Sequence, residues 1–141
     1  MRITLLDNND NIQEIAGLNW GQNPNNHTVT DDAYITIRSR FIRDPNNIFP
    51  PKGNNNTIRI VWDDGTEMNG LLEGNQTING QVFPKQLSST PHKNTLGLYL
   101  KNRLNVPSGM AIEPIHLQNY GRSDIDISVL DDGSYFFDFS I

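Results

Sequence analysis

Two stretches of the sequence have the pattern of a β-hairpin, and they constrain the fold more than any other feature. TIRIVWDDGTEMNGLLEG spans residues 57–74 and DIDISVLDDGSYFFDF spans residues 124–139. In both, apolar and polar residues alternate on either side of an Asp-Gly pair, which suits a tight primed turn. The residues expected on one face are Ile58, Ile60 and Trp62 in the first stretch, and Ile125, Ile127, Val129, Tyr135, Phe137 and Phe139 in the second. Each stretch therefore predicts two antiparallel strands.

The remaining elements are short. Residues 3–6 and 33–37 are strand candidates, and residues 12–20 are expected to add another strand-like piece. NTLGLYLKNRLNV carries an apolar stripe at helical spacing after Asn94 or Thr95 as N-cap. EPIHLQNYG has Pro at a helix start and Gly at a helix end, which predicts about two helical turns. The sum is a mainly antiparallel β fold with two small helices, a barrel or a sandwich.

Length and composition exclude several classes of protein for this chain. The chain has 141 residues, which predicts one domain spanning residues 1–141. It has no cysteine, which excludes disulfides, thiolate zinc sites and cysteine nucleophiles. The first twenty residues include several acids and do not resemble a signal peptide, and no apolar run approaches the ~18–20 residues needed to span a bilayer. We therefore expect a soluble, cytoplasmic protein with no membrane partner.

Two long polar segments interrupt the strand pattern. One runs from Gly21 to Asp32, directly after Leu18 and Trp20, and the other is expected to be a loop from Glu73 to Asn94. Ordering a loop costs about 1–2 kcal/mol per residue in backbone entropy, and these side chains bury little apolar surface in return. Loops of this length in a compact domain are usually functional or disordered. We expect Leu18 and Trp20 to anchor the first one.

Charge is distributed unevenly along the chain. The net charge is −5, yet residues 74–112 contain no Asp or Glu and include Lys85, Lys93, Lys101 and Arg103. Residues 33–57 contain Arg38, Arg40, Arg43 and Lys52 against one acid, Asp44. Local potential decides where a polyanion binds, so the acidic total does not exclude one.

The residues needed for catalysis are not brought together by any motif. His27, His92 and His116 lie far apart, without a second metal ligand at the usual spacing. Two of the three Asp-Asp pairs precede Gly in the predicted turns, where Asp is a favoured residue for structural reasons alone. Motifs for serine hydrolases, phosphate-binding loops and zinc proteases are missing. We expect no catalytic site, metal or cofactor in this chain.

The polar segments carry the residue types that recognise nucleic acids. Asn and Gln bond adenine, Arg and Lys bond guanine, and Asp accepts a hydrogen bond from the cytosine amino group. Arginines able to hold phosphates follow the first segment. On its own this composition is a weak signal, since a polar loop is more often simply solvated.

Five motifs occur together in one order: GLNWGQ, AYITI, LGLYLKNRL, LQNYGRSDI and FFDFS, from Gly17 to Ser140. This series resembles the B3-like DNA-recognition domains of type II restriction endonucleases. These include the C-terminal domains of phospholipase-D-type enzymes and the N-terminal effector domains of EcoRII-type enzymes. The resemblance implies a seven-stranded open pseudobarrel with two short helices. It also implies two loops that grip the major groove, an N-arm at about residues 19–32 and a C-arm at about residues 75–94.

The resemblance predicts a bacterial, sequence-specific double-stranded DNA-binding domain without its own catalysis, monomeric and fused to a nuclease domain in the full enzyme. It implies a short DNA site of about five base pairs. The first arm has no Arg or Lys, so base contacts there would come from amides, His27 and Asp32. Expected base contacts are Gln22, Asn25, Asn26, His27 and Asp32 in the N-arm, and Lys85, Gln86, Ser88, Lys93 and Asn94 in the C-arm. Expected phosphate contacts are Arg38, Arg40, Arg43, Lys52, Lys101 and Arg122, the last also as a support for the barrel.

Two other functions fit parts of the sequence. A carbohydrate- or protein-binding β module would use Trp20, Trp62 and Tyr99 as partly exposed platforms. An enzyme with a dispersed acid pair would use Asp31 and Asp126. Ligand binding that ignores ionic strength would favour the first alternative, and cleavage of DNA by the isolated chain, with or without magnesium, would favour the second.

Overall fold

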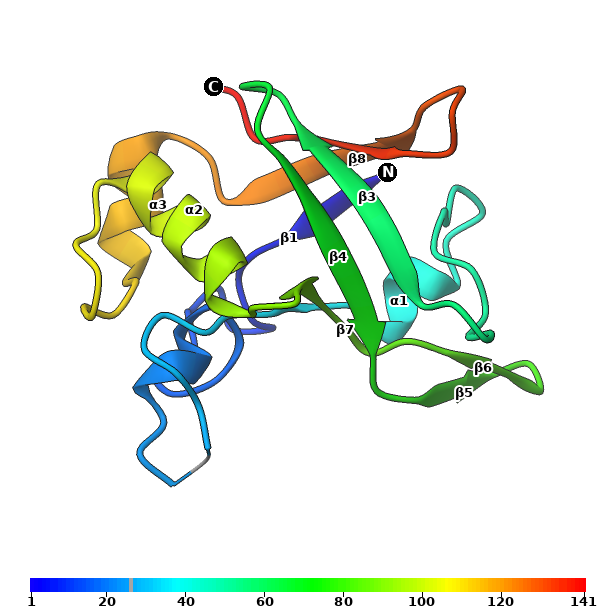
Figure 1. Cartoon of the computed structure of the whole chain (residues 1–141), viewed down its shortest axis with the longest axis horizontal. Helices are drawn as coiled ribbons and strands as arrows, with labels where there is room; N and C mark the ends of the chain where they lie inside the picture. The colour runs from blue at the N-terminus through cyan, green and yellow to red at the C-terminus, as the bar shows by residue number, and fades with distance from the viewer. Residues whose placement is uncertain (26) are drawn as a thin grey trace.

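The main sheet of the protein has seven strands and curves into a half-open barrel (Figure 1). The structure is a computed structural model and describes residues 1–25 and 27–141. The strand order is β1-β8-β9-β3-β4-β7-β2, and all neighbours are antiparallel except β3 and β9. The strands are β1 (Arg2–Thr4), β2 (Ile35–Thr36), β3 (Thr57–Trp62), β4 (Glu67–Glu73), β7 (Gln86–Thr90), β8 (Asp124–Val129) and β9 (Tyr135–Asp138). The expected mainly β fold with a seven-stranded open pseudobarrel is confirmed.

Both predicted hairpins form where the alternation and the Asp-Gly pairs placed them. β3 pairs with β4 and β8 pairs with β9, and the turn glycines Gly65 and Gly133 have φ angles of 88° and 87°. Such left-handed backbone favours glycine, which explains its place in both turns. The predicted primed turn type is wrong, because Asp64 and Asp132 do not have the positive φ that an Asp-Gly primed turn requires. Trp62, Phe137 and other alternating residues fill the inside of the barrel. The fully buried side chains with the largest volumes include Trp62, Phe49, Phe137, Phe139, Ile60, Leu87 and Leu100.

Helices cover one open end of the sheet, at the left of Figure 1. α2 (Asn94–Leu104) and α3 (Pro114–Tyr120) are the two predicted helices. α3 starts at Pro114 and ends before Gly121, whose φ of 101° suits the helix end. A 3-10 helix, η1 (Gly17–Gln22), and one turn of helix, α1 (Ser39–Ile42), complete the set. The strand-like piece expected over residues 12–20 is wrong, because η1 occupies its second half.

The C-arm is more ordered than the predicted polar loop. It contains a separate two-stranded ribbon of β5 (Gln76–Ile78) and β6 (Gln81–Phe83), and then β7 of the main sheet. Asn79 and Gly80 form the two-residue turn, with φ angles of 51° and 79°. Positive φ at both positions is the geometry that Asn-Gly favours in hairpins. In the described part of the chain, no helix is long and apolar enough to cross a membrane.

Candidate nucleic-acid interface

Two segments project from the same side of the sheet, the lower side in Figure 1. One is the N-arm, and the other is the β5–β6 ribbon of the C-arm. The edge strand β2 and its neighbour β7 lie between them, with Ile35 opposite Leu87 and Thr36 opposite Gln86. The two arms thus lie on either side of β2 and β7 (Figure 1).

The N-arm is closed at its root by hydrogen bonds of its own backbone. Gly21 N donates to Asp32 O at 2.8 Å, and Asp32 N donates to Val29 O at 3.0 Å. Asp32 Oδ2 in turn accepts a hydrogen bond from Val29 N at 2.9 Å. This carboxylate is largely buried and shapes the loop. Its expected base contact stays a prediction and would have to compete with the hydrogen bond from Val29.

A buried ion pair ties the N-arm to α2. Lys101 Nζ donates to Asp31 Oδ1 at 2.5 Å, and both side chains are 2–3% exposed. The same carboxylate accepts hydrogen bonds from Ser108 Oγ and from Gly109 N. Burial acts to raise the pKa of Asp31, but these hydrogen bonds outweigh it and the pKa is lowered. The expected phosphate contact of Lys101 is therefore wrong, because its ammonium is buried on an internal carboxylate.

α2 approaches the N-arm so closely that a side chain at Gly97 would not fit. A Cβ atom added there would lie 1.7 Å from Asp31 O, a backbone atom. Gly97 and Lys101 are one helical turn apart, so they face the same residue. Glycine in the interior of α2 is thus explained by contact with the arm.

Trp20 forms part of the root, as expected, but is not fully buried. Its ring makes an edge contact with Tyr34 at 5.6 Å between centroids, and the Lys93 ammonium lies 5.4 Å from its centroid. Lys93 also forms an ion pair with Glu73. Lys93 is therefore engaged with its own protein, and its expected base contact would have to replace that pair.

The C-arm ribbon is fixed at its base by an amide. Gln76 Nε2 donates to Ile37 O at 2.8 Å and to Pro84 O at 2.7 Å. Ile37 N donates to Lys85 O at 2.8 Å, which joins the arm to the segment after β2. Lys52 Nζ donates to Asn75 Oδ1 at 2.9 Å. The position of the ribbon relative to the segment after β2 is thus set by several hydrogen bonds.

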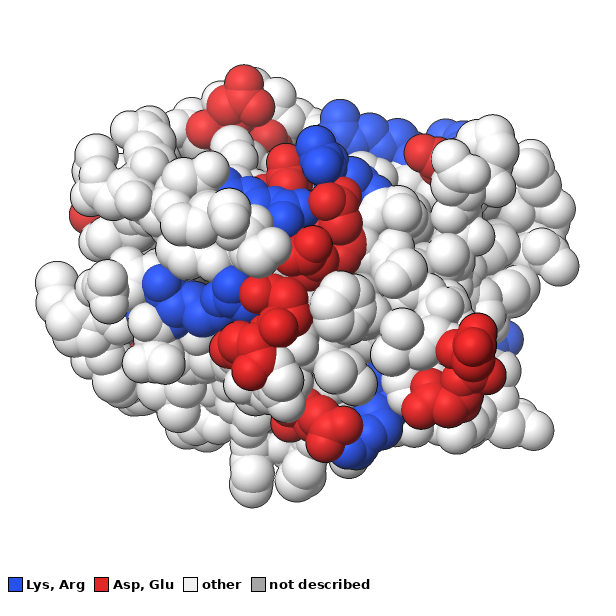
Figure 2. Space-filling model, turned by 90° about the horizontal axis from the view of Figure 1, so that it is seen from above, with Lys and Arg blue, Asp and Glu red and all other residues white. Residues whose placement is uncertain are grey.

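The cations of the protein divide into two groups. Within residues 1–25 and 27–141, six have a carboxylate within 4.0 Å: Arg2, Arg59, Lys93, Lys101, Arg103 and Arg122. The other five, Arg38, Arg40, Arg43, Lys52 and Lys85, have no such partner among the described residues. Four of these lie between β2 and β3, and the fifth, Lys85, lies in the C-arm. Figure 2 shows the side opposite the arms, where acidic residues form a band beside paired basic residues.

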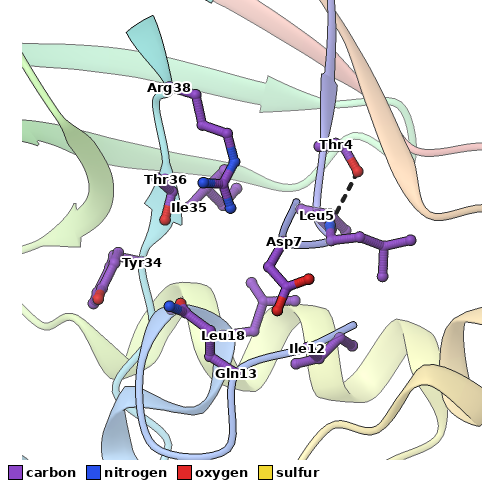
Figure 3. A pocket seen from close by; sticks show the side chains of 12 residues that line it. Thr4, Leu5, Asp7, Ile12, Gln13, Leu18, Tyr34, Ile35, Thr36 and Arg38 are labelled. Atoms are coloured by element: carbon purple, nitrogen blue, oxygen red, sulfur yellow. Dashed lines mark hydrogen bonds between the residues drawn. The ribbon is translucent and has the colours of Figure 1, made fainter. Parts of the chain in front are cut away.

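The recess between β2 and the C-arm is lined mainly by polar and basic residues. Its lining residues are Asn8, Thr36, Ile37, Arg38, Ser39, Arg40, Gln76 and Lys85. A smaller neighbouring cavity shares Thr36 and Arg38 with it, and the Arg38 guanidinium points into that cavity, toward the Asp7 side (Figure 3). Arg40 and Lys85 are exposed, whereas Arg38 is half-buried. Arg40 and Lys85 are therefore the more accessible cations of the recess.

The other predicted contacts fall into three classes. Asn25 and His27 are exposed on the N-arm, and Gln86 and Asn94 are half-buried. Gln22 Nε2 donates to Gly109 O at 3.0 Å, so this amide is partly occupied. Asn26 lies outside the described residues. Another shallow hollow brings Asp32, His92, Lys93 and Asn94 together beside Val29 and Pro91, at the root of the N-arm.

Ser88 and Arg122 are placed differently from the prediction. Ser88 is fully buried on β7 and its Oγ bonds Glu73, which corrects its expected base contact. Arg122 binds Asp124 at 2.8 Å and Asp126 at 2.7 Å. Arg122 therefore supports the end of the sheet, which is one of its two expected roles. Its phosphate contact stays a prediction and would have to displace these carboxylates. Hydrogen bonds from Arg2 and Arg122 lower the pKa of Asp126 to about 2.

The geometry also bears on the two alternative functions. Trp62 is fully buried and packs on Phe137, so it is not an exposed platform for a sugar. Asp31 pairs with Lys101, and Asp126 pairs with Arg2 and Arg122, so these acids belong to separate networks. Among the described residues, no three His, Asp or Glu side chains lie close enough to hold a metal ion together.

Comparison with known proteins agrees with this arrangement. The model of one protein family, the NgoFVII C-terminal B3-like DNA-binding domain, matches residues 1–131. No curated protein matches the sequence.

Proposed function

Because this chain belongs to the family of the NgoFVII C-terminal B3-like DNA-binding domain, a DNA-binding module of a restriction enzyme, we propose that it recognises a short sequence through the major groove. We also propose a site of about five base pairs, the length that the resemblance in sequence implies. We also propose that cleavage is carried out by a separate nuclease domain of the full enzyme. Asp31 and Asp126, the acids considered as a catalytic pair, are each held by cations of the fold.

The observation that carries the proposal is the position of the cations without a carboxylate partner. An ion pair neutralises its cation, and displacing the carboxylate costs free energy, so an unpaired cation is the better phosphate ligand. Arg40 lines the recess, Lys52 donates to Asn75 at the base of the C-arm, and Arg43 directly follows α1. The acidic band lies on the side opposite the arms (Figure 2). This distribution would orient a duplex toward the arms even though the net charge is −5.

The shape of the C-arm supports contact with the major groove. The major groove of B-form DNA is about 12 Å wide and admits a two-stranded β-ribbon. The β5–β6 ribbon is such an element, and the Gln76 amide fixes its base. Lys85 follows the ribbon and Gln86 begins β7 at the floor of the recess. Base reading is therefore assigned to Lys85, Gln86 and Asn94 and, from the N-arm, to Asn25, Asn26 and His27.

A selection from a pool of random duplexes tests the proposal directly. We expect one short motif to be enriched, and binding to it to weaken steeply as salt concentration rises. A pool that returns no motif, or binding that ignores ionic strength, would contradict it. Release of DNA fragments by the isolated chain in the presence of magnesium would show that the nuclease activity resides here instead.

Lys85→Ala separates base reading from general attraction to DNA. We expect it to weaken binding to the selected duplex by about 1–3 kcal/mol, and binding to a scrambled duplex by less. Gln86→Ala should behave similarly, and it leaves the net charge unchanged. The measurement is a titration of both duplexes at one salt concentration.

Arg59→Ala is the control, because Arg59 is exposed and paired with Glu67 at 2.7 Å. Equal losses on both duplexes would remove Lys85 from the base contacts.

A further inference from the structure

An exposed apolar face on the C-arm ribbon has no role in the contacts described so far. Val82 is 42% exposed on β6, and its cross-strand neighbour is Thr77 on β5, which is also exposed. Ile78 and Phe83, which point to the opposite face by the alternation of the strands, are buried. The Val82–Thr77 face is therefore the one turned away from the body of the protein.

The backbone around Val82 is held in place. Val82 O accepts a hydrogen bond from Lys52 N at 2.8 Å, and the Asn79-Gly80 turn fixes the strand register. Valine is stiff about χ1, so a contact made by this side chain would cost little rotamer entropy. Val82 and Thr77 present three methyl groups on neighbouring positions of one rigid ribbon face.

Single exposed apolar residues are common on protein surfaces. Val82 differs in its surroundings, because it lies within a run of 39 residues without Asp or Glu, on a ribbon whose other exposed side chains include Thr77, Asn79 and Gln81. No acid on the ribbon would repel DNA. In the major groove, the only apolar group that a base pair presents is the C5-methyl of thymine, which apolar and threonine side chains contact.

We propose that Val82, together with the Thr77 methyl group, reads the C5-methyl group of a thymine in the recognised sequence. This inference rests on the proposed function, since it requires the ribbon to enter the major groove. It adds a specificity contact of a different kind from the amides and lysine, because removing the methyl group leaves every hydrogen bond of the base intact. It also requires the recognised sequence to contain at least one A·T pair.

Deoxyuridine substitution tests this contact. Each thymine of the selected duplex is replaced in turn by deoxyuridine, which lacks only the methyl group. Binding is then measured for the wild type, Val82→Ala and Val129→Ala. Val129 is the matched control, because it is a 47% exposed valine on β8, outside both arms. At one thymine we expect the substitution to weaken binding by the wild type about three- to fivefold. Val82→Ala should bind the thymine duplex more weakly than the wild type does, by the same factor. Its affinity should not fall further when deoxyuridine replaces that thymine, whereas Val129→Ala should behave as the wild type.

The outcomes separate this inference from the proposed function. Absence of any enriched duplex would contradict the proposed function itself. If the wild type binds a selected duplex but no deoxyuridine weakens binding, the methyl contact is overturned while DNA recognition stands. The same holds if Val82→Ala keeps the full sensitivity to deoxyuridine, or if the selected site contains only G·C pairs.

Discussion

Replacing Lys101 with methionine should lower the free energy of unfolding by about 3–5 kcal/mol, the range measured when one partner of a buried ion pair is removed. Methionine fills much of the volume of the lysine stem but leaves the Asp31 carboxylate buried without its cation. Ser108 and Gly109 would still donate to that carboxylate, yet they carry no charge. Chemical denaturation at neutral pH measures the difference. Lys85→Met, at an exposed lysine, is the control and should change stability by no more than about 0.5 kcal/mol.

The double variant Asp31→Asn/Lys101→Met shows whether the charge or the packing is responsible. Asparagine keeps an oxygen for the bonds from Ser108 and Gly109 and removes the negative charge. If the charge dominates, the double variant should lose less unfolding free energy than the two single variants lose together. The difference, the coupling energy, should be at least about 1 kcal/mol. Losses that simply add would show that Lys101 stabilises the fold through its aliphatic stem alone.

The difference in unfolding free energy between the wild type and Lys101→Met should depend on pH in one direction. Burial acts against ionisation of Asp31, but the bonds from Lys101, Ser108 and Gly109 prevail and lower its pKa below the usual value. A carboxylate with a lowered pKa stabilises the fold above the unfolded value of about 3.9, and this contribution is lost as pH falls through the lowered folded value. The gap in stability between the wild type and Lys101→Met should therefore be full at neutral pH and narrow in acid. A gap that widens below pH 4 would contradict the role of the ion pair.

The elements predicted correctly from the sequence are those whose pattern is repeated and ends in a strong turn signal. β3–β4 and β8–β9 each combine alternation with Asp-Gly, and α3 combines Pro114 with Gly121. The β5–β6 ribbon was missed because each strand has only three residues, too few to show alternation. Its one available signal was the Asn79-Gly80 pair, which is a strong indication of a two-residue hairpin turn.

The charge of the candidate site was easier to predict than the role of each residue in it. The acid-free segment indicated a basic surface, and Lys85 is exposed there as expected. Lys101 belongs to the same segment but lies one helical turn from Gly97 and next to Leu100 on the buried side of α2. That helical spacing was a local signal of burial. Its partner Asp31 is 70 positions away and could be identified only from the folded chain.

Removing three unpaired cations together should have the largest effect on DNA binding. In the variant Arg40→Gln/Arg43→Gln/Lys52→Gln, the log–log slope of affinity against salt should become shallower by about 2.7, because each lost phosphate contact contributes about 0.9. At about 0.1 M salt this corresponds to an affinity about 100- to 1000-fold lower. Specific and scrambled duplexes should lose affinity nearly equally, since phosphate contacts position the protein without reading sequence.

The control for this variant is Arg2→Gln/Arg59→Gln, which removes two exposed arginines that already have carboxylate partners. If total charge governed binding, each lost arginine would change the slope as much as Arg40 or Arg43 does. If the duplex lies against the arms and the recess beside the C-arm, the control should keep nearly the slope of the wild type, because Arg2 and Arg59 neutralise Asp126 and Glu67 and not phosphates. A control slope that falls in proportion to the charges removed would place the duplex elsewhere on the protein, and Arg40, Arg43 and Lys52 would then lose their assignment as phosphate ligands.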